Sequence, residues 1–182
     1  MALDRMELHW FPMRVAHHRE LRVRDELQRL NIEHYLPLKW GQRIYGGHIR
    51  RVQVPVVNII FVHSTQDKIT REKMYNEELS YLRYMMNVCQ GEESASEIMT
   101  VSDREMDNFI KATRHDDDRM RYLAYTDFID KEGRRVKVVD GDFAGVEGQI
   151  KRIRKDRVVV VCVRGVVAVA LQIPFSQLEF IT

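Results

Sequence analysis

The chain has 182 residues, a formal net charge of +2, 45% hydrophobic and 31% charged residues, a composition typical of one ordinary domain or two small ones and not of a disordered chain. No apolar run is long enough to cross a membrane, and the N-terminal residues lack the pattern of a secretion signal, so we expect a cytoplasmic protein with no membrane partner. Cys89 and Cys162 lie far apart without metal-ligand spacing and are expected to be free thiols.

The charges are unevenly distributed along the chain. Residues 119–182 hold 12 Lys and Arg against 8 Asp and Glu, whereas residues 1–118 hold 17 against 19. Residues 1–51 alone hold 10 against 6, so the acidic excess lies downstream of them. The sequence therefore allows a basic face near the N-terminus.

The first elements combine strand and helix patterns. Residues 8–15 (LHWFPMRV) predict a strand, in which Pro12 is tolerable only at an edge or a bulge. Residues 16–30 predict a helix, because apolar residues recur there at i, i+4 and i+7. Asn31 tolerates the left-handed conformation that ends many helices, and residues 32–38 predict a second strand.

A hairpin is expected next, over residues 39–52, because Gly46-Gly47 is a typical hairpin tip. Its arms interleave basic and aromatic side chains, which can hold a phosphate backbone and stack on unpaired bases. The alternative, a solvated hairpin whose aromatic rings pack on its own strands, stays open. The side chains concerned are Lys39, Trp40, Arg43, Tyr45, Arg50 and Arg51.

Further elements complete an α+β pattern. Residues 53–63 predict an apolar central strand, residues 67–79 a second helix or a variable insertion, and residues 82–88 a further strand. Residues 102–114 predict a helix that begins with a capping box formed by Ser102 and Glu105. The order β-α-β-β-α-β with one extra helix indicates a ferredoxin-like domain.

The C-terminal part is rich in strand patterns. A charge run at residues 115–121 is expected to begin a linker. Five short strands are then expected, over residues 134–139, 147–153, 157–163, 166–171 and 179–181, and together they indicate a small all-β barrel. Between the first two lies a glycine-rich loop, whose glycines permit tight turns or close backbone approach. The spaced residues are Gly133, Val136, Gly141, Phe143, Gly145 and Gly148.

This spacing resembles the KOW motif, the opening of a small SH3-like barrel in ribosomal proteins and NusG-type transcription factors; the alternative is an ordinary hairpin. Residues 9–14 (HWFPMR), 35–37 (YLP), 60–62 (IFV) and 102–109 resemble the N-terminal NGN domain of the same family. The resemblance implies an NGN domain at 1–114 that binds RNA polymerase, a linker at 115–130 and a KOW domain at 131–182.

One departure points to a subgroup of the family. Housekeeping NusG proteins usually carry Pro-Gly-Tyr in the central strand, where this chain has Val57-Asn58-Ile59. Residues 54–62 (VPVVNIIFV) are more similar to UpxY-type proteins, bacterial paralogues that promote transcription of capsular polysaccharide operons. The resemblance therefore implies a transcription antitermination or elongation regulator of selected operons.

The resemblance also implies which side chains contact each partner. An apolar NGN surface is expected to dock on the clamp of the largest RNA polymerase subunit, with Phe61 favoured as core because strand residues alternate between faces. Residues that form or support this surface are Trp10, Phe11, Tyr35, Ile59 and Phe61. Non-template DNA or nascent RNA is expected at His17, His18, Arg19, Arg22, Arg43, Arg50 and Arg51. Rho or a small-subunit ribosomal protein is expected at the KOW loop, with Phe143 as the candidate contact.

Catalysis is not expected from this sequence. Six of seven histidines precede residue 64, but none forms an HExxH pattern, and no phosphate-binding GxxxxGK[ST] loop is present. We expect a monomer without metal or cofactor. Two alternatives remain: a general NusG-type factor, or a KOW-type protein that binds RNA or the ribosome through the barrel residues Lys151, Arg152, Arg154, Lys155 and Arg157.

Overall fold

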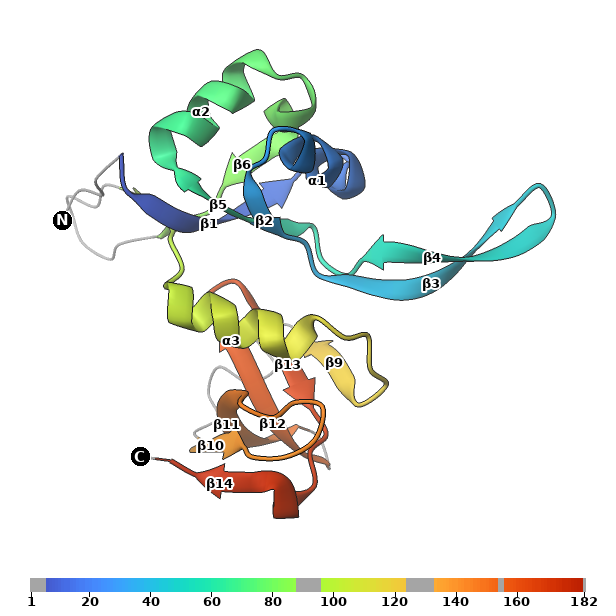
Figure 1. The fold of residues 1–182 in the computed structure, drawn as a ribbon, viewed down its shortest axis with the longest axis vertical. Helices are drawn as coiled ribbons and strands as arrows, with labels where there is room; N and C mark the ends of the chain where they lie inside the picture. Colours follow the sequence, from blue (N-terminus) through green and yellow to red (C-terminus); the bar gives the residue numbers. More distant parts are fainter. Residues whose placement is uncertain (1–5, 88–95, 124–132, 154–155, 182) are drawn as a thin grey trace. The chain divides into compact units, whose positions relative to one another are not determined.

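The computed structural model describes residues 6–87, 96–123, 133–153 and 156–181, and the chain forms two compact units, Met1–Asp103 and Arg104–Thr182 (Figure 1). The first contains β1 (Leu8–Val15), α1 (Glu20–Arg29), β2 (Glu33–Tyr35), β3 (Leu38–Tyr45), β4 (His48–Pro55), β5 (Ile59–Thr65), α2 (Gln66–Tyr75), β6 (Leu82–Tyr84), β7 (Met86–Asn87) and β8 (Glu97–Ile98). The second contains α3 (Asp103–Thr113, which begins at the division), β9 (Met120–Leu123), β10 (Arg134–Val138), β11 (Glu147–Ile153), β12 (Asp156–Val163), β13 (Val167–Leu171) and β14 (Leu178–Phe180).

The main sheet of the first unit has the order β2-β5-β1-β6, with every neighbouring pair antiparallel. β5 lies between the two strands that flank α1, and β1 lies between the two strands that flank α2. This double split βαβ arrangement is the ferredoxin-like fold. The predicted α+β class is therefore confirmed.

β1 has the predicted bounds, but it is an interior strand rather than an edge. Proline has no N–H group, and at Pro12 this lack does not break the pairing with β5. The N–H and C=O of one residue in an antiparallel strand point to the same side, and the Pro12 carbonyl accepts a hydrogen bond from the Met85 N–H at 3.3 Å. The absent N–H would therefore point toward β6 and not toward β5. The β1–β6 ladder begins only at Met13, so Pro12 removes no bond from it.

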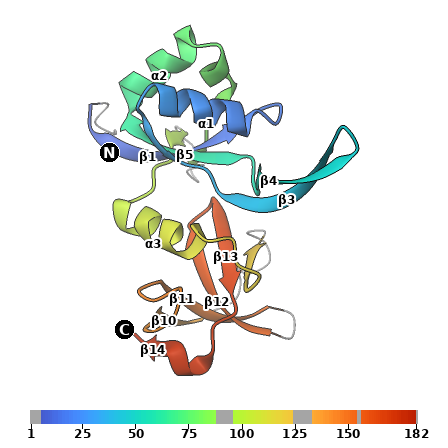
Figure 2. The same ribbon diagram turned by 45° about the vertical axis from the view of Figure 1, so that its right-hand side comes forward.

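Both main helices cover one face of this sheet (Figure 2). α1 contributes Val23 and Leu27, which lie one turn apart and are fully buried. The helix ends as predicted: Asn31 follows it with a φ of 51°. The core on this face is formed by Phe11, Met13, Val15, Val23, Leu27, Ile32, Leu36, Ile60, Val62, Ile69, Leu79 and Leu82.

The predicted strand at 53–63 is in fact divided between two sheets. β4 ends at Pro55 and β5 begins at Ile59, while the Val56 N–H bonds the Pro37 carbonyl at 3.1 Å and the Asn58 carbonyl accepts from Val15 at 2.9 Å. β3 and β4 form a separate two-stranded sheet. Its tip is the predicted pair Gly46 and Gly47, with φ of 55° and 82°.

The second unit contains an antiparallel sheet in the order β14-β10-β11-β12-β13-β9. Five of these strands match the predicted ones within a few residues. The sixth, β9, comes from the segment expected to be a linker and pairs with β13. Residues 124–130 of that segment lie outside the described residues.

The helix α3 belongs to the second unit, although the sequence suggested the first. The Asn108 side chain donates to the Glu147 carbonyl at 2.7 Å and accepts from the Glu147 N–H at 2.8 Å. The Glu105 carboxylate accepts a hydrogen bond from the Arg164 N–H at 2.7 Å. These long-range bonds explain why the compact units divide at Asp103–Arg104 and not at residue 114.

The glycines of the second unit have two different roles. A Cβ at Gly133 would lie 2.5 Å from the Ile150 carbonyl oxygen, and one at Gly148 would lie 2.6 Å from a Val159 methyl group, so both permit close strand packing. Gly141 and Gly145 have φ of 83° and 87° and form the loop between β10 and β11.

Candidate binding surfaces

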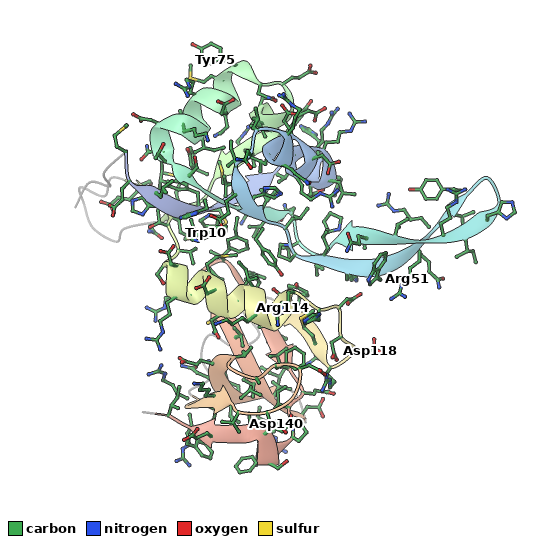
Figure 3. All side chains as sticks on the ribbon, in the orientation of Figure 1. Trp10, Arg51, Tyr75, Arg114, Asp118 and Asp140 are labelled. Carbon is green, nitrogen blue, oxygen red and sulfur yellow. The ribbon has the colours of Figure 1, made fainter. Side chains whose placement is uncertain are left out.

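The second face of the main sheet of the first unit, opposite α1 and α2, is apolar. Side chains alternate along a strand, so Trp10 and Pro12 point away from the helix-side core that contains Phe11 and Met13. Phe61 is the register partner of Pro12 on one side and of Tyr35 on the other. We call Trp10, Pro12, Tyr35, Ile59 and Phe61 the outer face. Figure 3 shows Trp10 on this sheet.

The outer face contains four of the five residues predicted to form or support the polymerase-facing patch. Trp10, Ile59 and Phe61 are at most 6% exposed in the whole chain, yet none is a member of the helix-side cluster. Phe11 is different, because it belongs to that cluster and cannot share a surface with Trp10. The outer face is bordered by His63, whose ring stacks on Trp10 with centroids 4.8 Å apart and whose Nδ1 lies 2.6 Å from a Glu33 oxygen.

A basic groove of about 610 Å³ lies beside the start of α1. It is lined by His18, which precedes the helix, by Glu20, Leu21 and Arg22 from the helix, by Arg43 from the hairpin, and by residues 54–58 at the end of β4 and before β5. The fold thus brings together predicted nucleic-acid residues from segments about twenty residues apart. The groove is also lined by Val57 and Asn58, where housekeeping NusG proteins usually carry Pro-Gly.

Two histidines in front of α1 have an unusual backbone conformation. His17 and His18 both have positive φ, 59° and 54°. Such a conformation is uncommon for non-glycine residues, costs about 1–3 kcal/mol, and gathers at binding sites. The His17 ring meets Tyr81 edge-on at 5.9 Å, and both histidines are exposed.

Arg19 and Arg22, at the start of α1, are partly neutralised by a distant acidic residue that no local sequence pattern indicates. Arg19 lies 4.5 Å above the Tyr81 ring and 3.5 Å from Glu78. Arg22 lies 3.6 Å from the same carboxylate. Glu78 therefore positions both cations and lowers the net charge that they offer to a phosphate.

The hairpin separates its arginines onto two faces. Arg43 and Arg50 are direct register partners and so lie on one face, whereas Arg51 lies on the other, with its guanidinium 4.9 Å from the centre of the Trp40 ring. Figure 3 shows Arg51 on this projecting hairpin. Like charges directly opposite one another destabilise a sheet, and no ion pair of Arg43 or Arg50 is found among the described residues. A bound anion would relieve this repulsion.

The KOW-like loop places its predicted contact residue inside the protein. Phe143 is 2% exposed, and the Arg119 guanidinium lies 5.1 Å from the centre of its ring. Arg119 is held by Asp117 at 2.6 Å and by Asp142 at 2.5 Å, and hydrogen bonds from Arg119 lower the pKa of Asp117. Phe143 therefore shapes the loop, and its ring offers no open surface. Val136 is also fully buried.

The barrel cations of the RNA-binding alternative do not form one continuous surface. Lys151 is 8% exposed, whereas Arg152 and Arg157 are exposed. Arg154 and Lys155 lie outside the described residues. Cys162 is half-buried, and burial raises the pKa of its thiol; Cys89 is not among the described residues.

Neither a metal-binding cluster nor a membrane-crossing helix is found among the described residues. No group of His, Cys, Asp and Glu within residues 6–87, 96–123, 133–153 and 156–181 could hold a metal ion. No described helix is long and apolar enough to cross a membrane.

These features define a two-unit α+β binding protein with an apolar sheet face and a basic groove. Residues 8–110, more than half of the chain, match the family model described as transcription termination factor nusG. The chain therefore belongs to the NusG family, whose members are non-enzymatic transcription factors that bind RNA polymerase.

One solved structure, described as domain interaction in Thermotoga maritima NusG, matches with a TM-score of 0.47 and 19% sequence identity. The match covers 98% of this chain and 100% of that one. No curated protein matches this chain.

Proposed function

We propose that this chain is a specialised NusG paralogue that binds RNA polymerase through its first unit and suppresses pausing or termination in selected operons. The observation that carries this proposal is the outer face, where Trp10, Ile59 and Phe61 gather on the side of the sheet opposite α1 and α2. These three side chains are at most 6% exposed in the chain, so docking on polymerase requires the segments that cover them to move aside.

The outer face would dock on the clamp of the largest polymerase subunit. A protein that binds one polymerase state better than another shifts the equilibrium toward that state by its differential affinity. No bond needs to be made or broken, so the mechanism is mechanical. The family's non-enzymatic character agrees with this mechanism.

Recruitment to chosen operons would use the basic groove. His18, Arg22 and Arg43 line it, and the Arg43–Arg50 pair lacks an acidic partner among the described residues. Arginine on phosphate supplies salt-dependent affinity, whereas base-edge contacts supply sequence preference. Non-template DNA or nascent RNA is the proposed ligand.

Specialisation for capsular polysaccharide operons is supported by residues 54–62, which resemble the UpxY-type paralogues. Val54 to Asn58 line the basic groove, so the subgroup's departure lies beside the proposed nucleic-acid site. A general NusG-type factor is the second candidate. Genome-wide occupancy on DNA separates the two, because a specialised factor occupies a few operons and a general factor most transcription units.

The first experiment measures binding of the purified chain to a reconstituted RNA polymerase elongation complex. The test variant is Tyr35→Ala with Ile59→Asp, which removes a ring from the outer face and places a charge on it. The matched control is Met74→Ala with Tyr75→Ala, because these side chains are 72% and 82% exposed at the end of α2. We expect the test variant to lose binding and the control to keep it.

Two results would contradict the proposal. In one, the test variant has a wild-type circular dichroism spectrum and still binds the elongation complex as the wild type does. In the other, the wild type fails to bind polymerase while ribosomes capture it, which would favour the ribosome-associated alternative. Rho or a ribosomal protein remains a proposed partner of the second unit, through the loop around Gly141 and Gly145 and not through the Phe143 ring.

A further inference from the structure

Two adjoining hollows of about 470 and 330 Å³ lie at one end of the β10-β11-β12-β14 part of the second unit. They share Ile150, Arg157 and Phe175 among their lining residues. We call the surface formed by Arg134, Ile150, Arg152, Arg157, Phe175 and Phe180 the aromatic–arginine groove. Gly133 also lines the smaller hollow, whereas Gly141 and Gly145 of the glycine-rich loop line neither.

The rings of this groove are exposed. Phe175 is 55% and Phe180 40% exposed, with ring centroids 5.8 Å apart and planes inclined by 58°. Neighbouring Val136 and Val138, on the same face of the sheet, are fully buried. Two phenylalanines that stay this exposed beside a complete core leave ring surface open to a flat ligand.

The cations of the groove lack neutralising partners. Arg152 and Arg157 are direct register partners across β11 and β12, an arrangement that repels without an anion between them. No ion pair or hydrogen bond of either side chain is found among the described residues. The Arg134 guanidinium lies over the Phe180 ring, 4.2 Å from its centre.

Acidic residues near the groove point away from it. Asp156 precedes Arg157 on β12, and Glu179 precedes Phe180 on β14. Since adjacent strand residues face opposite sides, neither carboxylate shares the face of the groove. The face is therefore both aromatic and positive.

We propose that the aromatic–arginine groove binds single-stranded nucleic acid, as a second site beyond the first unit. An unpaired strand supplies a phosphate for the Arg152–Arg157 pair and a base for Phe175 or Phe180 at every nucleotide. An acidic peptide would satisfy the arginines but would leave the two rings without a flat partner. The nucleic acid is thus the ligand that matches both halves of the groove.

The test uses the full chain and fluorescence anisotropy with labelled oligouridine and oligothymidine of about 12 nucleotides, a length within the usual range for small β folds. To remove the first-unit contribution, every variant also carries Arg43→Gln and Arg50→Gln. The groove variants add either Arg152→Gln with Arg157→Gln, or Phe175→Ala with Phe180→Ala. The charge-matched control adds Arg121→Gln with Arg164→Gln, both exposed residues outside the groove.

We expect each groove variant to bind about tenfold more weakly than its background, and the control to stay within about twofold. Loss of the one phosphate that the arginine pair holds also lowers the salt slope of log K by about 0.7, the value for each phosphate on a single strand. The RNA and DNA arms show which sugar the groove prefers, and either preference supports the proposal.

The inference is overturned if folded groove variants bind as their background does. It is also overturned if a labelled oligoglutamate peptide binds and neither oligonucleotide does, because the groove then docks an acidic protein segment. Thermal unfolding followed by circular dichroism checks the fold of each variant. The aromatic and arginine variants substitute different side chains, so one variant that fails to fold leaves the other as the test.

Discussion

Two hairpins of this protein use the same antiparallel pairing for opposite purposes. In β12–β13 every residue is buried except Asp156, Arg157 and the half-buried Cys162. In β3–β4 no residue is buried, and Ile44 and Ile49 remain 74% and 68% exposed. The backbone ladder is therefore not what distinguishes a buried hairpin from an exposed one.

The difference lies in what the side chains meet. Valines in β12–β13 lose water contact on both faces, and this burial supplies most of the stabilisation. The β3–β4 hairpin leaves apolar, aromatic and basic side chains in solvent, so its contribution to folding is small and its surface is available to a ligand. Substitutions should accordingly reduce stability in one hairpin and binding in the other.

The largest expected effect comes from matched aliphatic truncations in the two hairpins. Leu171→Ala leaves a cavity at a fully buried site and should lower the free energy of unfolding by about 2–5 kcal/mol. Ile49→Ala should change it by less than about 0.5 kcal/mol, because the side chain is 68% exposed. Urea unfolding followed by circular dichroism measures both. Equal losses would show that the exposed hairpin is also structural.

Glycine-to-alanine substitutions at Gly148, in the buried sheet, and at Gly47, at the tip of the exposed hairpin, test the same difference in stability. A Cβ at Gly148 would lie 2.6 Å from a Val159 methyl group and 2.7 Å from the Val160 carbonyl oxygen, so Gly148→Ala should cost about 1–3 kcal/mol through overpacking. A Cβ at Gly47 would meet no atom within 4 Å, so Gly47→Ala should lower the free energy of unfolding only through the strain of an alanine at a φ of 82°, about 1 kcal/mol. The same urea titration gives both values. A Gly47 variant less stable than the Gly148 variant would contradict this order.

Substitution of Arg43 and Arg50 tests whether the exposed β3–β4 hairpin contributes to nucleic-acid binding. Arg43→Gln with Arg50→Gln should leave stability within about 0.5 kcal/mol. It should lower the salt slope for single-stranded DNA by about 0.7, because the pair is expected to share one phosphate. Anisotropy at several salt concentrations measures the slope. The matched control is Lys68→Gln with Arg71→Gln on the exposed surface of α2; a similar loss there would mean that only net charge matters.

The smallest effect comes from a polar clamp on the surface of the first unit. Hydrogen bonds from Arg29 and Asn76 lower the pKa of Glu26 from its ordinary 4.5 to about 2. A lowered folded-state pKa gives stability that is present above pH 4.5 and is lost as the pH falls toward 2. Glu26→Gln should therefore melt earlier than wild type at pH 7, and the difference should shrink at low pH.

Thermal unfolding at several pH values measures this effect. The exposed Glu77→Gln serves as the control. A difference between Glu26→Gln and wild type that stays constant down to pH 2 would show that the carboxylate bonds are not its source.

The sequence predicted most elements because their patterns are local. The β1 bounds, the Gly46-Gly47 tip and five strands of the second unit follow from alternation and turn residues alone. The split at Val56–Asn58 was missed because the apolar run is continuous in sequence, and only tertiary hydrogen bonds to Pro37 and Val15 break it.

Site residues were harder to predict, for physical reasons. The alternation of side chains along a strand indicates that some of the predicted polymerase-facing residues must face the core. Only the β1–β5 pairing register shows that Phe11 lies on the helix-side face and that Trp10 and Phe61 share the other face. Phe143 resembles a contact residue in sequence, yet Arg119 from a distant segment covers it. Phe175 and Phe180 were missed because their exposure depends on where β14 ends beside β10.

The short strand β9 has a practical consequence for dividing this protein. Because it pairs with β13 through Leu123, Tyr122, Arg121 and Met120, a fragment that starts at Gly133 would leave the apolar strand β13, Val167–Leu171, with unpaired N–H and C=O groups. Such an edge recruits strands from other molecules and promotes aggregation. A soluble C-terminal fragment should therefore include β9, and it should begin before α3 because Asn108 of that helix bonds Glu147.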